Sequence, residues 1–256
     1  MGRRHDLPAV PAIVTAGALA FLLIWYLIGA RLRAGNRGYF VGAWAILALA
    51  LIGLDSSADR SFAGHMLQHE LIMLGAAPLM VLARPIAPLL RPLPYVWRRR
   101  VGWLLTRSSV RAAWRALTMP AVAWVLQAAV IWAWHMPFLF ERAVGNPWIH
   151  ALQHFSFFVG AALFWWSVVH RGRRVAVLSL FTTAVHSGAL GALLAFSNYS
   201  WYPAYAIDDQ RLAGLIMWIP GGTVYLAAAL LGIHRYLSVA PSTSNNGSLA
   251  SLVTKA

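Results

Sequence analysis

Apolar runs of about 20 residues recur along this chain, and short segments between them hold almost all of its charge. A helix of that length crosses the hydrocarbon core of a bilayer, which is about 30 Å thick. Of the 256 residues, 60% are hydrophobic and only 11% are charged, so a soluble fold would lack charge to cover its surface. These features predict an all-α membrane protein with about seven transmembrane helices in a bundle.

The runs predict one transmembrane domain over residues 1–237, followed by a disordered cytoplasmic tail over 238–256 that is rich in small and polar residues. The expected spans are 9–30, 38–54, 62–83, 118–139, 148–169, 175–196 and 212–233.

The connections between the spans differ in charge. One side receives 16 of the 21 basic residues, and the other side receives six of the seven acidic ones. Basic loops stay in the cytoplasm, so the N-terminus is expected outside and the C-terminus inside. We therefore interpret the formal net charge of +14 as basic loops that face anionic lipids of the bilayer. Nucleic acid is not an expected partner. The basic segment 96–117, with tryptophans at helical spacing, predicts one amphipathic helix on the membrane surface.

Five of the nine histidines fall at similar depth near the outer ends of three predicted spans. Two pairs, His65/His69 and His150/His154, have i, i+4 spacing, which puts each pair on one helix face. Polar side chains are costly in a bilayer and indicate function by default. The fifth is His135, and together these residues predict a metal or cofactor site.

The two pairs also belong to a repeat. Both segments read His-x-Leu-Gln-His, then five intervening residues, then Gly-Ala-Ala, at a constant offset of 85 residues. We therefore expect the two pairs to face one another. Proline and glycine at Pro78 and Pro220-Gly221-Gly222 are expected to break two spans locally.

The chain has no cysteine, which excludes disulfides and thiolate metal sites. Imidazole suits copper, zinc, iron and nickel, and thioether sulfur selects Cu(I), so the methionines favour copper. The candidate metal ligands are the five histidines together with Met66, Met136 and Met217. Glu70 is a candidate outer partner that orients an imidazole. Asp209 belongs to an acidic mouth, with Asp55, Asp59 and Asp208, that would attract cations or is simply solvated.

Other readings are a copper transporter, in which His186 would be a relay, or a membrane electron carrier with a single haem. A zinc protease is disfavoured because Glu70 follows His69 and does not stand between two histidines. No nucleophile–base arrangement or phosphate-binding loop is evident, so we do not expect an enzyme.

Three segments resemble the CtaG family of cytochrome c oxidase assembly factors, which are polytopic proteins of bacterial inner membranes. They are His65-Met66-x-Gln68-His69 through Arg84-Pro85, Trp134-His135-x-Pro137 through Phe164-Trp165-Trp166, and Asp209-Gln210 through Pro220-Gly221-Gly222. The resemblance implies a role in maturing the copper centre of the oxidase catalytic subunit, which would be the partner. A periplasmic copper donor would be a second partner.

Overall fold

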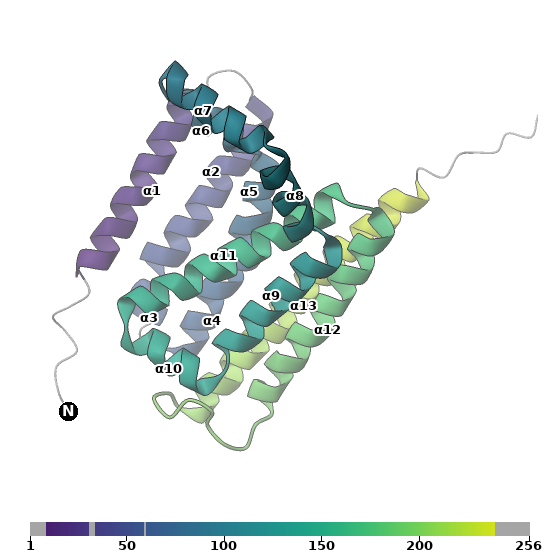
Figure 1. Cartoon of the computed structure of the whole chain (residues 1–256). Coiled ribbons are helices and arrows are strands. Elements are labelled where there is room, and N and C mark those ends of the chain that lie inside the picture. The colour runs from purple at the N-terminus through teal and green to yellow at the C-terminus, as the bar shows by residue number, and fades with distance from the viewer. Residues whose placement is uncertain (1–8, 31–33, 59, 239–256) are drawn as a thin grey trace, which may run out of the picture.

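The computed structural model describes residues 9–30, 34–58 and 60–238, and all regular structure in these ranges is helical (Figure 1). The predicted all-α fold class is confirmed. The expected tail, 238–256, lies outside the described residues except for Ser238. The helices, two of them π-helical (η), are α1 (Ala9–Gly29), α2 (Ala34–Ala48), η1 (Leu49–Gly53), α3 (Asp55–Ala58), α4 (Phe62–Glu70), η2 (Leu71–Ala76), α5 (Ala77–Ala83), α6 (Ile86–Leu90), α7 (Tyr95–Thr106), α8 (Ser108–Leu117), α9 (Pro120–Trp134), α10 (Pro137–Gly145), α11 (Pro147–His170), α12 (Arg173–Ala195) and α13 (Ile207–Leu237).

Five helical stretches of the described chain are long and apolar enough to cross a membrane. A sixth results if α8 and α9, which meet at a bend of 64°, count as one span. The described apolar part of α1, Val14–Gly29, is shorter than the others. A multi-pass membrane protein is therefore supported, and the number seven stays a prediction. The five stretches are Asn36–Gly53, Phe62–Ala83, Pro147–His170, Val175–Ala195 and Ile207–His234.

Helices α12 and α13 pack lengthwise against each other, and α13 also packs against α4. Their closest approach is at Gly191 and Gly214. A Cβ atom added to Gly214 would lie 2.5 Å from the carbonyl oxygen of Gly191. Small residues allow this approach between membrane helices, where close packing takes the place of the hydrophobic effect.

Two π-helical segments interrupt the regular helices near the histidines. η2 follows Glu70 directly, and the indole Nε1 of Trp165 donates a hydrogen bond of 3.0 Å to the carbonyl of Met73 within it. In η1 the carbonyl of Ala50 accepts a hydrogen bond of 2.6 Å from the amide of Gln68. Side chains of neighbouring helices thus bond to π-helical carbonyls, and such segments occur frequently at functional sites.

The predicted break at Pro220 is wrong, because α13 runs without interruption from Ile207 to Leu237. A proline removes a single backbone donor, and packing against neighbouring membrane helices lets a helix continue through it. At Pro78 the span also stays helical, and the distortion takes the form of the π-helix that precedes it.

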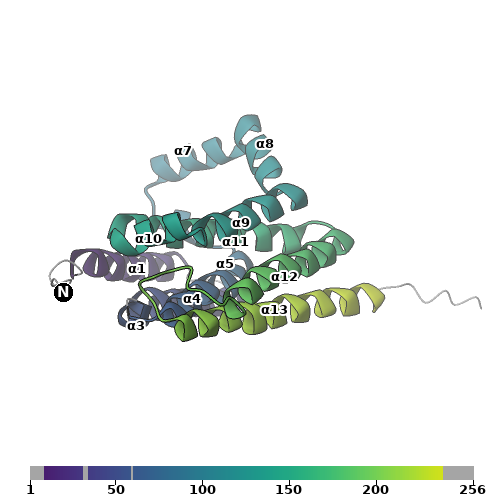
Figure 2. The same ribbon diagram turned by 90° about the horizontal axis from the view of Figure 1, so that it is seen from below.

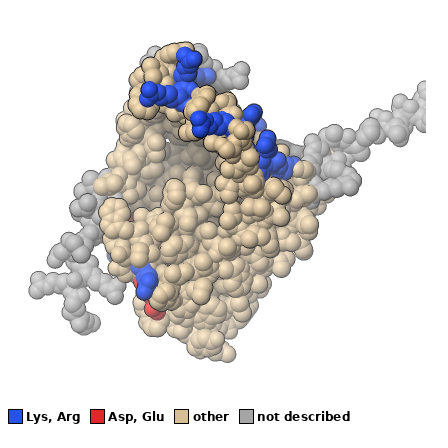
Figure 3. Space-filling view, in the orientation of Figure 1, with Lys and Arg blue, Asp and Glu red and all other residues tan. Residues whose placement is uncertain are grey.

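The basic segment forms two helices, α7 and α8, joined at Arg107, where one helix was expected. No side chain in either helix is buried. Figure 2 shows the pair standing apart from the other helices, and Figure 3 shows its basic side chains along one edge of the molecule. We call this pair the arginine arch; its arginines are Arg98, Arg99, Arg100, Arg107, Arg111 and Arg115.

The arginine-rich connections meet at the end of the bundle that carries the arch. Arg171 donates hydrogen bonds to the carbonyl of Arg115 and the hydroxyl of Thr118, at 3.3 and 2.7 Å. Arg91 bonds the carbonyl of Gly29 at 3.2 Å. Helices α3 and α10 lie at the opposite end (Figure 1). The predicted separation of charge between two ends is therefore present, while the side of the membrane that each end faces stays a prediction.

Candidate metal centre

The two histidine pairs face one another across the contact between α4 and α11, as the repeat predicts. The ring centroids of His65 and His150 are 5.0 Å apart, and those of His69 and His154 are 5.2 Å apart. Within the pairs the separations are 4.4 Å on α4 and 4.3 Å on α11. We call these four residues the imidazole cluster.

Three imidazoles of the cluster are closed off from solvent. His65, His69 and His154 expose 2%, 1% and 9% of their surface. The Nε2 atoms of His65 and His154, and both ring nitrogens of His69, are buried without a hydrogen-bond partner. Each buried polar atom left in that state costs about 1–3 kcal/mol. A metal ion would satisfy such nitrogens, so the donor set fits one.

The imidazole rings of the cluster would have to turn before they could bind one metal ion together. Imidazole nitrogen binds transition metals at about 2 Å, so two rings on one ion place their centroids about 5 to 6 Å apart. The separations between rings on different helices, 5.0, 5.2 and 6.2 Å, match this spacing. However, no three His, Asp or Glu side chains among the described residues converge on a common point suited to a metal ion. Rotation of the side chains about χ1 and χ2 would be needed to aim the nitrogens together.

His135 forms a second donor group with Met66. Its Nδ1 lies 2.7 Å from the carbonyl oxygen of Ile131, which can only accept, so Nδ1 carries the proton. The bare Nε2 is then directed at the sulfur of Met66, 3.4 Å away. An imidazole nitrogen and a thioether, neither with a proton to share, form a pair of soft donors of the kind that favours Cu(I). Phe157 links this pair to the cluster, since its ring contacts both His69 and His135.

The helix ends hold both histidine pairs in place. Ser61 caps α4, and its hydroxyl accepts from the backbone N–H of Gly64. Asn146 caps α11, accepting from Trp148 and Ile149. These caps are also 85 residues apart, and each precedes the first histidine of its pair by four residues. The repeat therefore includes the start of each helix, a signal that was present in the sequence and was missed.

A family model described as the cytochrome c oxidase caa3 assembly factor (Caa3_CtaG) matches residues 11–238, which include every helix of the candidate centre. The chain belongs to this family of assembly factors. The resemblance stated from the sequence is thereby confirmed, and the family description implies the oxidase as the partner. Neither the curated proteins nor the solved structures gave a match.

In this member of the assembly-factor family, Asp209 reaches from α13 to the start of α4. Its carboxylate accepts from the hydroxyl of Ser61 at 2.8 Å and from the backbone N–H groups of Phe62 and Ala63 at 2.6 and 3.1 Å. Asp209 thus fixes the helix end that carries the first histidine pair. Its predicted attraction of cations stays a prediction.

The remaining acids of the predicted mouth are placed differently. Asp208 is exposed and forms an ion pair with Arg211 at 3.3 Å. Asp55 begins the short helix α3, and Asp59 lies outside the described residues.

Tyr202, in the loop between α12 and α13, supports the second donor group. Its hydroxyl donates to the backbone carbonyl of His135 at 2.7 Å. Burial raises the pKa of this phenol, so it remains protonated and keeps donating. Sequence reasoning gave no reason to single out this residue.

Other candidates lie away from the imidazole cluster. The carboxylate of Glu70 faces Gly221 on α13, and among the described residues it has no hydrogen bond to an imidazole. Met136 is 57% exposed, whereas Met217 is buried in the same apolar core as Phe157. His186 packs against Trp124 and accepts from Trp132 at 3.4 Å, in contact with α9.

Proposed function

We propose that this assembly factor holds copper at the imidazole cluster and the neighbouring His135/Met66 group, and passes it to the catalytic subunit of cytochrome c oxidase. In this proposal it is a metallochaperone and not an enzyme. Its arginine-poor end faces the periplasm of a bacterial inner membrane, where a copper donor would load it. Copper is thus a transiently bound cargo and not a resident cofactor of the protein.

The observation that carries the proposal is the set of four imidazoles, from two helices, whose rings lie 4.3 to 6.2 Å apart. Three of them bring buried nitrogens without hydrogen-bond partners. Packing alone does not account for so many unsatisfied polar atoms in an apolar setting. The absence of cysteine and the soft donor Met66 favour copper over the other metals that imidazole binds.

The first test measures copper bound per protein after purification of the full chain in detergent. Wild type is expected to retain near-stoichiometric copper, and His69→Ala and His154→Ala are each expected to lower copper affinity by at least about 10- to 100-fold, the loss typical of groups that only support metal ligands. His186→Ala is the matched control, because it removes an imidazole from the same membrane region without touching the cluster. Equal copper in all four proteins would contradict the ligand assignment.

Transport of copper across the membrane is the second candidate. Beyond the cluster, polar groups continue on adjacent helices. Glu70 faces Gly221 on α13, and Tyr225 lies one turn further along the same helix. The hydroxyl of Tyr225 accepts a hydrogen bond of 2.9 Å from the amide of Gln127. These buried polar groups between spans favour a path for ions. Copper uptake into sealed vesicles containing the purified protein would support transport, and its absence alongside stoichiometric binding would support the assembly role.

A further inference from the structure

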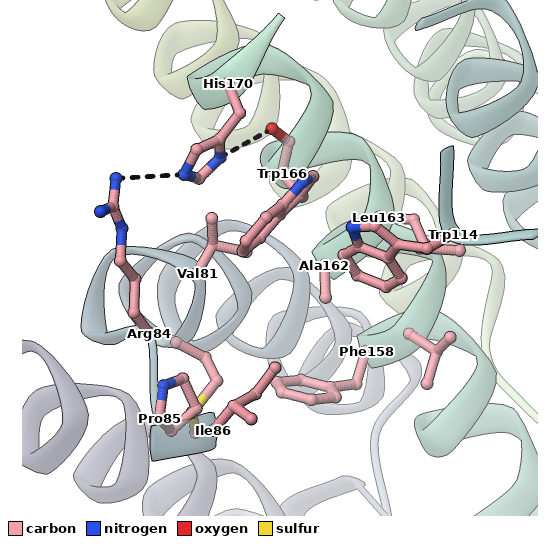
Figure 4. A pocket seen from close by; sticks show the side chains of 12 residues that line it. Val81, Arg84, Pro85, Ile86, Trp114, Phe158, Ala162, Leu163, Trp166 and His170 are labelled. Carbon is pink, nitrogen blue, oxygen red and sulfur yellow. Dashed lines mark hydrogen bonds between the residues drawn. The ribbon is translucent and has the colours of Figure 1, made fainter. Parts of the chain in front are cut away.

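A cavity of about 450 Å³ lies beside the arginine arch, between α5, α8 and α11, and Figure 4 shows it from close by. Along α11 its lining runs from Phe158, one helical turn from His154 of the imidazole cluster, to His170 at the end of the helix. Its walls are apolar: Val81 comes from α5, Trp114 from α8, and Phe158, Ala162 and Leu163 from α11. Of the described residues that line it, only Arg84 and His170 are ionisable. Figure 4 shows both together at one end, and Phe158 and Ile86 toward the other. The cavity is thus amphipathic, with one cationic end.

The cationic end is held by a chain of hydrogen bonds. His170 Nδ1 lies 3.1 Å from the carbonyl oxygen of Trp166, so Nδ1 carries the proton, and Nε2 accepts from Arg84 Nη2 at 3.2 Å. The His170 ring also stacks on Trp166 with centroids 4.0 Å apart. The Arg84 guanidinium is therefore oriented, and most of its five N–H donors are left over for an acceptor.

No carboxylate of a residue that the structure describes forms an ion pair with this arginine. Among the residues that the structure describes, the one ion pair joins Arg211 to Asp208 at the opposite end of the bundle. A guanidinium that is oriented but lacks an acidic partner favours a bound anion, and phosphate matches its planar fork of donors.

The backbone of Arg84 gives an independent indication. It has φ 48° and ψ 58°, and it is the only non-glycine residue of the described chain with positive φ. Glycine adopts this left-handed conformation without penalty, whereas a residue with a side chain does not. Strain of this kind collects at functional positions, and here it accompanies the cationic end of the cavity.

We infer that this cavity binds one anionic phospholipid, with an acyl chain along the apolar walls and the phosphate on Arg84. The membrane supplies this ligand to a multi-pass protein, and the cavity is lined in part by Trp114 of the arch, which presents exposed arginines and aromatic rings. Free phosphate would leave the apolar walls unused, and a neutral apolar molecule would leave the guanidinium unpaired. An anionic phospholipid complements both ends.

The test titrates the full-length protein in detergent with phosphatidylglycerol or phosphatidylcholine of the same acyl chains, and counts bound lipid by native mass spectrometry. Wild type is expected to bind one phosphatidylglycerol at least tenfold more tightly than phosphatidylcholine. Arg84→Gly should remove this preference without harming the fold, since glycine suits the backbone there. Arg84→Lys should keep part of it. Ala162→Phe, which fills the cavity, should weaken both lipids.

Two matched controls make the result specific. Arg142→Gln removes one exposed positive charge from the opposite end, and Ala151→Phe adds the same ring to an exposed position of α11 away from the cavity. Both should bind phosphatidylglycerol like wild type. Equal losses in Arg84→Gly and Arg142→Gln would overturn the proposal in favour of general attraction to net charge. Equal binding of both lipids, unchanged in Arg84→Gly, would overturn it in favour of a neutral occupant.

Discussion

At the scale of residues, the decisive feature of the candidate centre is which atoms remain unpaired. Asp209, Ser61 and Asn146 satisfy the backbone donors at the starts of α4 and α11. Tyr202 satisfies a carbonyl at His135. The helix ends that carry the histidines are therefore well bonded, while several imidazole nitrogens, and the side-chain amide of Gln153 between the second pair, are not. This contrast points to the rings, and not to the helix ends, as the groups that await a ligand.

Asp209→Ala is expected to destabilise the protein by about 0.5–2 kcal/mol, the usual cost of losing a helix cap. It should also weaken copper retention, because α4 carries His65 and His69 directly after the bonded residues. Thermal unfolding in detergent and copper content measure the two effects. Asp208→Ala is the control, as its carboxylate is exposed and pairs only with a neighbouring side chain at 3.3 Å. If Asp208→Ala proved as harmful as Asp209→Ala, the capping role would be wrong.

The histidine pairs were predictable because spacing and an internal repeat are local properties of a sequence. The role of Asp209 was not, since its partners lie nearly 150 positions away in the chain. Met136 shows the same limit. Its neighbour His135 turns inward, whereas Met136 points to the surface, and the turn that separates them could not be placed from composition.

At the scale of elements, close helix contacts fix the geometry of α13, which in turn positions Asp209. Gly191 and Gly214 permit the approach of α12 and α13, and the proline within α13 does not interrupt it. Sequence patterns located these helices to within a few residues. They did not reveal the π-helical segments, because these depend on packing against other elements. The division of the basic segment at Arg107 was not predicted either.

Gly214→Ala is expected to cost about 1–3 kcal/mol, as is typical of overpacked cores. The added Cβ would lie 2.5 Å from a carbonyl oxygen and 2.6 Å from a backbone nitrogen of α12, so the two helices would have to separate. Gly222→Ala, on the same helix with no atom within 4 Å of the added carbon, should be neutral or slightly stabilising. Thermal unfolding of both variants in detergent measures this difference in stability. Equal melting temperatures would contradict the packing argument.

At the scale of the whole molecule, charge divides the bundle into two unlike ends. The arginine arch and the lipid cavity lie at one end, and the imidazole cluster lies toward the other. The sequence predicted this division through the positions of basic residues between spans. It did not predict the cavity, whose walls combine α5 and α6 with α8 and α11, which lie further along the chain.

The orientation can be tested directly because the chain contains no cysteine. Gly145→Cys places a thiol at the arginine-poor end, in open space, and Ser108→Cys places one at the start of α8. A membrane-impermeant maleimide applied to intact cells with a permeable outer membrane should label only Gly145→Cys. Both should react after the inner membrane is opened. Labelling of Ser108→Cys alone in intact cells would reverse the proposed topology.

The separation of the two histidine pairs by 85 residues has a consequence for biogenesis. While the ribosome has made only α4, half of the imidazole cluster exists, and its rings have no partners until α11 has entered the membrane and packed. An unfinished or misassembled chain therefore presents no enclosed cluster in which to trap a reactive metal. For a protein whose proposed cargo is toxic when released, loading would wait until folding is complete.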